Sequence, residues 1–97
     1  MEKEYYPVVV QAVAGPGRTV YAYFSDGQVK CYDMRAAIER SGVFAPLADE
    51  TFFSGRLTVL NDTVAWDLSG RYDPPDCIDL DPFEVYAAET VSDPLAG

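Results

Sequence analysis

The chain has 97 residues, of which 16 are acidic and 7 are basic, so its formal net charge is −9, and it contains no histidine. The lack of histidine excludes His-based acid–base catalysis, His metal ligands and a Ser-His-Asp triad. The negative charge argues against direct binding to nucleic-acid phosphates or to an anionic membrane surface.

At this length we expect one domain over residues 1–97, with its core at about 7–89 and a flexible tail over 90–97. No apolar run approaches the roughly 18 residues of a membrane span, and the first residues carry no signal-peptide pattern. Cys31 and Cys77 fit no metal-binding spacing and are expected to stay reduced. Together these features predict a cytoplasmic protein.

Three strands are expected first, at 7–14, 18–24 and 28–32, because apolar β-branched or alternating residues are bounded there by glycine-containing turns. The second strand alternates between two kinds of side chain, as a strand with one buried face does. Its core face is expected to hold Val20, Ala22 and Phe24, and its opposite face Thr19, Tyr21 and Tyr23.

A short helix over 34–41 is expected next, because the carboxylate of Asp33 can accept hydrogen bonds from the first backbone N–H groups of a helix. Helical spacing gives it a buried stripe of Met34, Ala37 and Ile38. The loop that follows is expected to place three further apolar side chains in the core: Val43, Phe44 and Leu47.

A second hairpin is expected from strands at 56–60 and 63–67, and its Trp66 is the largest candidate for the core. Residues 69–76 are expected to be irregular. A last helix is expected after Asp81, with Pro82 at its first position and Glu84 bonding back to the cap. Phe83, Tyr86 and Ala87 are expected on one face of it.

The resulting order β-β-β-α-β-β-α predicts an α+β domain, in which an antiparallel sheet of about five strands is accompanied by two short helices. A parallel sheet would require strands that alternate with longer crossover connections, and the chain lacks that alternation.

Short motifs, taken in their order along the chain, resemble the bacterial domain-of-unknown-function 2442 family. They are Asp26-Gly27, Asp33 before a short helix, Gly42-Val43-Phe44, Leu47-Ala48-Asp49, a phenylalanine at 52 or 53, Val64-Ala65-Trp66-Asp67, and the run from Asp76 to Pro82 that ends in Tyr86. The resemblance covers most of the chain, although the stretch between Trp66 and Ile78 is longer than in compact members. It implies a small α+β fold, a bacterial or phage origin and a gene arrangement suggestive of a toxin–antitoxin pair. It assigns no catalytic residue, because none is established for the family.

The acidic residues are concentrated in the second half of the chain, where residues 46–97 carry eleven acids and two bases. The densest cluster is Asp73, Asp76, Asp79 and Asp81. Such carboxylates could gather around a divalent cation or act as an acid–base pair. They do not follow the calcium-loop pattern, however, and a helix cap explains Asp81.

The seven tyrosines are many for this length, and Tyr21 and Tyr23 are expected on the outer face of the sheet. Exposed tyrosines are typical of protein interfaces, although these two could simply shield the sheet from solvent. The predicted partner-binding surface comprises Tyr21, Tyr23, Tyr72, Asp73, Asp76 and Asp79.

We expect no enzymatic activity, no cofactor and no bound metal. The favoured function is a small acidic protein-interaction module that binds a basic protein, for example as the antitoxin-like member of a two-gene system. Pairing with a second copy of the chain is also open. One alternative is a phage or mobile-element mimic of nucleic acid that inhibits a host defence nuclease, and another is a small-ligand or metal-binding domain.

Overall fold

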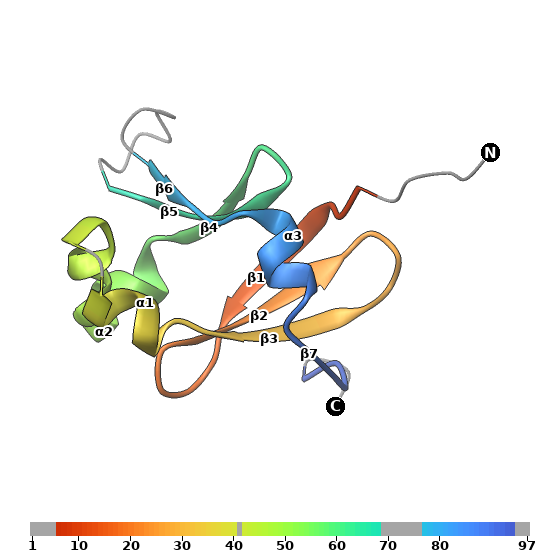
Figure 1. The fold of residues 1–97 in the computed structure, drawn as a ribbon, viewed down its shortest axis with the longest axis horizontal. Coiled ribbons are helices and arrows are strands. Elements are labelled where there is room, and N and C mark those ends of the chain that lie inside the picture. Colours follow the sequence, from red (N-terminus) through yellow and green to blue (C-terminus); the bar gives the residue numbers. More distant parts are fainter. Residues whose placement is uncertain (1–5, 41, 69–76, 95–97) are drawn as a thin grey trace.

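The computed structural model of the protein describes residues 6–40, 42–68 and 77–94, and these residues form two antiparallel sheets that face each other (Figure 1). The four-stranded sheet has the order β1-β2-β3-β7, from β1 (Val9–Ala14), β2 (Thr19–Phe24), β3 (Val29–Asp33) and β7 (Glu89–Val91). The three-stranded sheet has the order β4-β5-β6, from β4 (Leu57–Leu60), β5 (Thr63–Asp67) and β6 (Cys77–Asp79). The predicted α+β class is confirmed, whereas the prediction of one sheet with about five strands is wrong.

The predicted three-strand unit β1-β2-β3, which we call the first hairpin, and the predicted hairpin β4-β5 are both present. Each is extended by one more strand that the sequence did not reveal. β3 pairs with β7 and β5 pairs with β6, both in antiparallel register. β6 and β7 have only three residues each, too few for an alternating pattern to be detected. The two units therefore belong to separate sheets, one extended by β7 and the other by β6.

The predicted turns are confirmed by their backbone geometry. Asn61 and Asp62 join β4 to β5 with φ angles of 51° and 66°, as a two-residue hairpin turn requires. Gly27 has a φ of 93° between β2 and β3, in the region that glycine reaches without strain.

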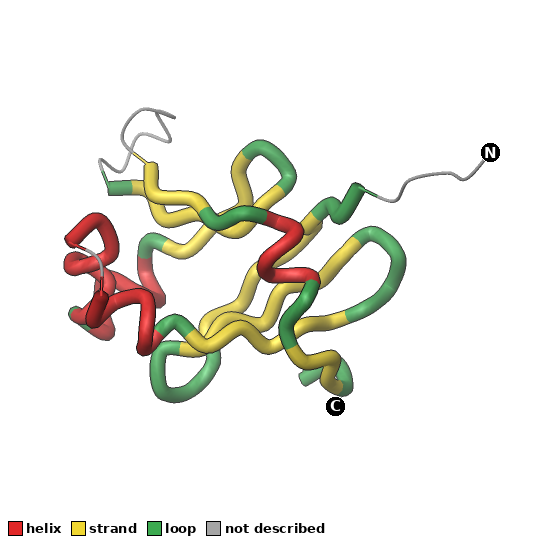
Figure 2. Tube along the Cα trace, viewed as in Figure 1, coloured by secondary structure: helices red, strands yellow, loops and turns green. Residues whose placement is uncertain are grey.

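Three short helices gather at one end of the molecule, shown in red at the left of Figure 2: α1 (Arg35–Arg40), the 3₁₀ helix η1 (Gly42–Ala48) and α2 (Glu50–Gly55). The Asp33 carboxylate accepts a 2.9 Å bond from the Arg35 N–H, as predicted. Helix α2 was not predicted. The Asp49 side chain caps it by accepting bonds of 2.9 Å from Thr51 N and 3.2 Å from Phe52 N.

The prediction that Val43 lies in the core is wrong, because its side chain is 64% exposed. The segment is a 3₁₀ helix and not a loop, so side chains three positions apart share a face. Leu47 is fully buried and Phe44 packs beside the core on that same face, while Val43 lies on another.

One hydrophobic core lies between the two sheets and is built from the inward faces of both. In β2 the predicted alternation is confirmed, because Val20, Ala22 and Phe24 are buried. Trp66 is fully buried, as predicted, and its indole N–H donates a 2.9 Å bond to the Phe53 carbonyl.

Helix α3 (Pro82–Tyr86) connects the three-stranded sheet to the last strand of the four-stranded sheet (Figure 1). The Asp81 cap is confirmed, because its carboxylate accepts a 3.0 Å bond from Phe83 N. Of the three residues predicted to share one face of this helix, Tyr86 packs against the core. Val85 is fully buried, whereas Phe83, about 200° around the helix from it, is 54% exposed. Ala87 is exposed as well. The Glu84 carboxylate accepts a bond from the Tyr32 hydroxyl, at 2.8 Å.

The predicted flexible tail begins too early in the chain. Thr90 and Val91, which we assigned to a loose tail, belong to β7 and pair with Lys30 and Val29. Residues 69–76, which the sequence predicts to be irregular, lie outside the described residues. Across the part of the chain that is described, no helix has the length and apolar character needed to cross a lipid bilayer.

Candidate interaction surface

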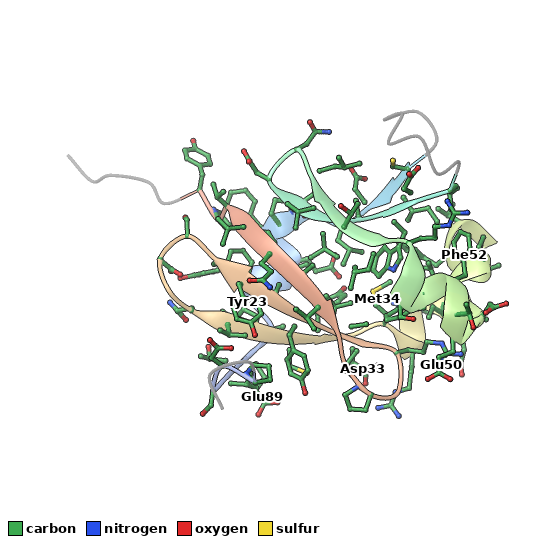
Figure 3. All side chains as sticks on the ribbon, turned by 180° about the vertical axis from the view of Figure 1, so that it is seen from behind. Tyr23, Asp33, Met34, Glu50, Phe52 and Glu89 are labelled. Carbon is green, nitrogen blue, oxygen red and sulfur yellow. The ribbon has the colours of Figure 1, made fainter. Side chains whose placement is uncertain are left out.

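Tyr21 and Tyr23 lie on the face of the four-stranded sheet that is turned away from the core, as predicted. We call this face the outer sheet face and define it by the residues that lie opposite one another across the strands. One row is Val13, Tyr21, Cys31 and Glu89, and the next is Gln11, Tyr23, Val29 and Val91. In the view of Figure 3 the sheet lies in front with Tyr23 on it, and no helix of the described residues crosses it.

Both tyrosines are half-buried because local contacts hold them against the sheet. A Cβ atom added at Gly15 would lie 2.7 Å from Cε2 of Tyr21, so the Tyr21 ring packs closely over that glycine. The Tyr23 hydroxyl donates a 2.6 Å bond to the Asp93 carboxylate. The rings are therefore held in defined positions at the surface, which lowers the entropy cost of binding a partner.

Acidic groups border the outer sheet face at the β7 edge, and an exposed valine lies at the β1 edge. Glu89 and Asp93 are exposed at β7, and Figure 3 shows Glu89 beside the sheet, below Tyr23. Val10, at the bulge in β1, is 59% exposed. The surface thus combines aromatic and apolar side chains with negative charge.

Asp79 is the one described residue among the predicted partner-binding carboxylates, and it does not lie on this surface. Asp79 lies in β6 opposite Ala65, on the face of the three-stranded sheet that is turned away from the core. Because the two sheets enclose one core, their outward faces lie on opposite sides of the molecule. Asp81 caps α3, and Tyr72, Asp73 and Asp76 lie outside the described residues. Within residues 6–40, 42–68 and 77–94, no three Cys, Asp or Glu side chains are grouped as metal ligands would be.

A network of polar side chains, which the sequence did not reveal, joins α3 and β7 to the first hairpin. The Tyr86 hydroxyl donates to Asp26 at 2.6 Å and accepts from Gln28 at 2.8 Å. Lys30 is buried on the inward face of β3, where its ammonium donates to Thr90 Oγ1 at 2.6 Å and lies 4.6 Å from the centre of the Tyr86 ring. The only sequence feature that points to the burial of Lys30 is the alternation along its strand, which places it on the inward face.

This network makes the stability of the fold sensitive to acid. The bond from Tyr86 and the backbone N–H of Gln28 hold the pKa of Asp26 below its ordinary value. A carboxyl whose pKa is lower in the folded than in the unfolded chain stabilises the fold above its unfolded pKa of about 3.9 and loses that contribution as the pH falls through the folded pKa.

We therefore expect Asp26→Asn to be less stable than the wild type at neutral pH, and the difference to shrink as the pH falls below about 4. Urea unfolding between pH 7 and pH 2 measures it. In a Tyr86→Phe background the pH-dependent part of the Asp26→Asn effect should be reduced, because the main hydrogen-bond donor is gone. A stability difference that stays constant down to pH 2 would contradict this role for Asp26.

A surface hollow of about 270 Å³ lies at the helical end and is lined by Arg18, Arg35, Ile38, Glu39 and Ala48. Its two guanidinium groups already have partners. Arg18 donates to the carbonyls of Leu47 and Ala48, and Arg35 forms a 2.7 Å ion pair with Asp33. The hydrogen bonds from Arg35 hold the pKa of Asp33 at about 2. Arg18 therefore holds the end of η1 and Arg35 holds the start of α1, and both roles are structural.

The described arginines gather at one end of the molecule, on or beside α1 and α2: Arg18, Arg35, Arg40 and Arg56. Exposed carboxylates accompany them there, at Asp33, Glu39, Asp49 and Glu50. The other end, formed by the two hairpin turns, α3 and β7, carries exposed carboxylates at Asp26, Asp62, Asp81, Glu84, Glu89 and Asp93. The one described base there is the buried Lys30. We call this second end the acidic end, and it draws carboxylates from both halves of the sequence.

Comparison with known proteins finds no match among family models, curated proteins or solved structures. The resemblance to the domain-of-unknown-function 2442 family therefore stays a prediction from the motifs.

Proposed function

We propose that this protein is a small non-enzymatic interaction domain, which binds a basic protein partner through the outer sheet face. The observation that carries the proposal is the combination on this face of two positioned tyrosines, Tyr21 and Tyr23, with carboxylates at its β7 edge. Tyrosines at the centre of an interface contribute much of its binding energy. Carboxylates at the rim attract a basic partner and increase its association rate.

The family resemblance adds an expectation about which protein this partner is. If the chain is the antitoxin-like member of a two-gene system, a neighbouring gene encodes the partner. Affinity purification from the source cell, read together with the flanking genes, supplies the candidate whose affinity is then measured with both proteins purified.

The decisive variant replaces both tyrosines by threonine, because threonine favours strands and keeps the backbone pairing. We expect Tyr21→Thr/Tyr23→Thr to raise Kd for the partner by at least about ten-fold, measured by calorimetry. Val43→Ala is the matched control, because Val43 is exposed at the helical end, away from this face. An unchanged Kd in the double variant would refute the proposal.

Two further measurements distinguish the competing functions. If a nuclease is bound through a mimic of nucleic acid, affinity will fall steeply with salt, and the loss will be the same in the tyrosine variant. If the partner contacts the predicted acidic cluster, Asp73→Asn/Asp76→Asn/Asp79→Asn will weaken binding, whereas our proposal expects that triple variant to bind almost as well as the wild type.

A further inference from the structure

An exposed pair of aromatic rings lies outside the outer sheet face, at the acidic end. Tyr6, just before β1, and Phe83, in the first turn of α3, meet edge to face with ring centroids 6.1 Å apart and planes at 77°. Tyr6 is 64% exposed and Phe83 is 54% exposed. Adjoining exposed aromatic side chains are unusual on a protein surface and are typical of sites that bind another molecule.

Each ring is held in place by buried neighbours. Phe83 follows the Asp81 cap, and the fully buried Val85 anchors the same helix. Tyr6 precedes the buried Pro7. The next residues are fixed by bonds of 2.9 Å, from Ser25 N to Val8 O and from Val9 N to Asp62 O. The pair is therefore preorganised and would not have to be ordered when a ligand binds.

Carboxylates are carried by three elements that adjoin the segments of the aromatic pair: α3, the β4–β5 turn and the β2–β3 turn. Asp81 and Glu84 are exposed on α3 beside Phe83. Asp62 is joined through its carbonyl to Val9, and Asp26 is joined through its carboxylate to Tyr86 of α3. The nearest described base is Lys30, whose ammonium is buried over the Tyr86 ring. The exposed charged groups described on these three elements are therefore all negative.

This combination selects a cation. The face of an aromatic ring carries negative charge density and attracts an ammonium or guanidinium group. The protein itself uses this attraction, because Arg18, Lys30 and Arg56 lie over the rings of Phe53, Tyr86 and Phe52. Guanidinium groups stack on aromatic rings and bond to carboxylates in the same plane, so arginine suits the site better than lysine.

We infer that Tyr6 and Phe83, with the carboxylates of Asp81 and Glu84, bind an arginine side chain in a basic segment of the partner protein. The inference rests on the proposed function in that it takes the partner to be basic. The site itself is separate from Tyr21 and Tyr23, which lie on the outer sheet face.

The test is an NMR titration of the full chain with the peptide acetyl-Gly-Arg-Gly-Arg-Gly-amide. A second peptide, in which citrulline replaces arginine, keeps the shape and removes the charge. We expect the arginine peptide to shift the backbone amide signals of α3 and of residues 6–9, and the citrulline peptide to leave them in place.

Three conservative changes separate the contribution of the aromatic ring from that of the carboxylates. Phe83→Leu keeps an apolar side chain and removes the ring, and it should raise Kd about two- to five-fold, as expected for an exposed cation–π contact. Asp81→Asn keeps a good N-cap, and Glu84→Gln keeps an acceptor for Tyr32. That double variant should raise Kd and weaken its salt dependence. Val43→Ala should bind the peptide as the wild type does.

The inference is overturned if the citrulline peptide produces the same shifts, or if Phe83→Leu binds the arginine peptide as tightly as the wild type. The tyrosine variant Tyr21→Thr/Tyr23→Thr should leave this titration unchanged. If the peptide titration fails but Tyr21→Thr/Tyr23→Thr still weakens partner binding, the arginine site is refuted and the proposed function stands. The reverse pattern removes the proposed function and keeps the arginine site.

Discussion

Replacing Trp66 by alanine is expected to lower the free energy of unfolding by about 3–5 kcal/mol, the usual cost of removing a large buried aromatic side chain. Trp66 is fully buried between Leu57 and Ile78 of the neighbouring strands. Its ring lies 5.3 Å from that of Phe53, and its N–H donates to the Phe53 carbonyl. Because a domain of this size is stable by only about 5–15 kcal/mol, the variant should lose a large part of its stability.

Urea unfolding followed by circular dichroism measures this change. Trp66→Phe should lose less, because it keeps most of the buried ring and forfeits chiefly the hydrogen bond. Val43→Ala, at an exposed position, should unfold as the wild type does. A Trp66→Ala protein that melts within a degree or two of the wild type would show that the indole does not support the core.

Gly15→Ala is expected to lower the free energy of unfolding by about 1–3 kcal/mol, the usual cost of forcing extra volume into a packed site. The added Cβ would lie 2.5 Å from Oγ1 of Thr19 and 2.7 Å from Cε2 of Tyr21. Thr19 cannot move freely, because its hydroxyl donates a 2.7 Å bond to the Pro16 carbonyl. The methyl group would therefore displace the Tyr21 ring from its position on the outer sheet face.

Gly55→Ala is the matched control, because a Cβ at Gly55 would meet no atom within 4 Å. Thermal unfolding of the two variants gives the stability difference, and the Tyr21 ring signals in an NMR spectrum report the displacement. If Gly15→Ala is as stable as Gly55→Ala and the Tyr21 signals stay unshifted, the close packing of the ring on Gly15 is refuted. If the proposed function is correct, the same variant also binds the partner more weakly.

The sequence predicted the features that depend on neighbouring residues. The alternation of β2, the turn at Asn61 and Asp62, and the Asp81 cap are each specified within a few positions, and all are confirmed. The burial of Trp66 also follows from its size and its place in a strand. The outward position of Tyr21 and Tyr23 was a consequence of the same alternation.

The features that the sequence did not reveal depend on distant partners or on very short elements. β6 and β7 are three-residue strands that pair with the edges of β5 and β3. The presence of two sheets therefore depends on pairing between segments that no local pattern connects. The exposed position of Phe83 depends on which residue of a five-residue helix meets the core, and Val85 takes that place. The pairing of Phe83 with Tyr6 joins residues that no short pattern connects.

The bond between the buried ammonium of Lys30 and the hydroxyl of Thr90 joins residues 60 positions apart. During synthesis on the ribosome, β3 emerges long before β7. Until β7 has emerged, Lys30 lacks its hydrogen bond to Thr90. Contacts of such long range slow folding. The four-stranded sheet is therefore completed after translation has passed residue 91, and a chain released before that point would leave the edge of β3 unpaired, which is a site for aggregation.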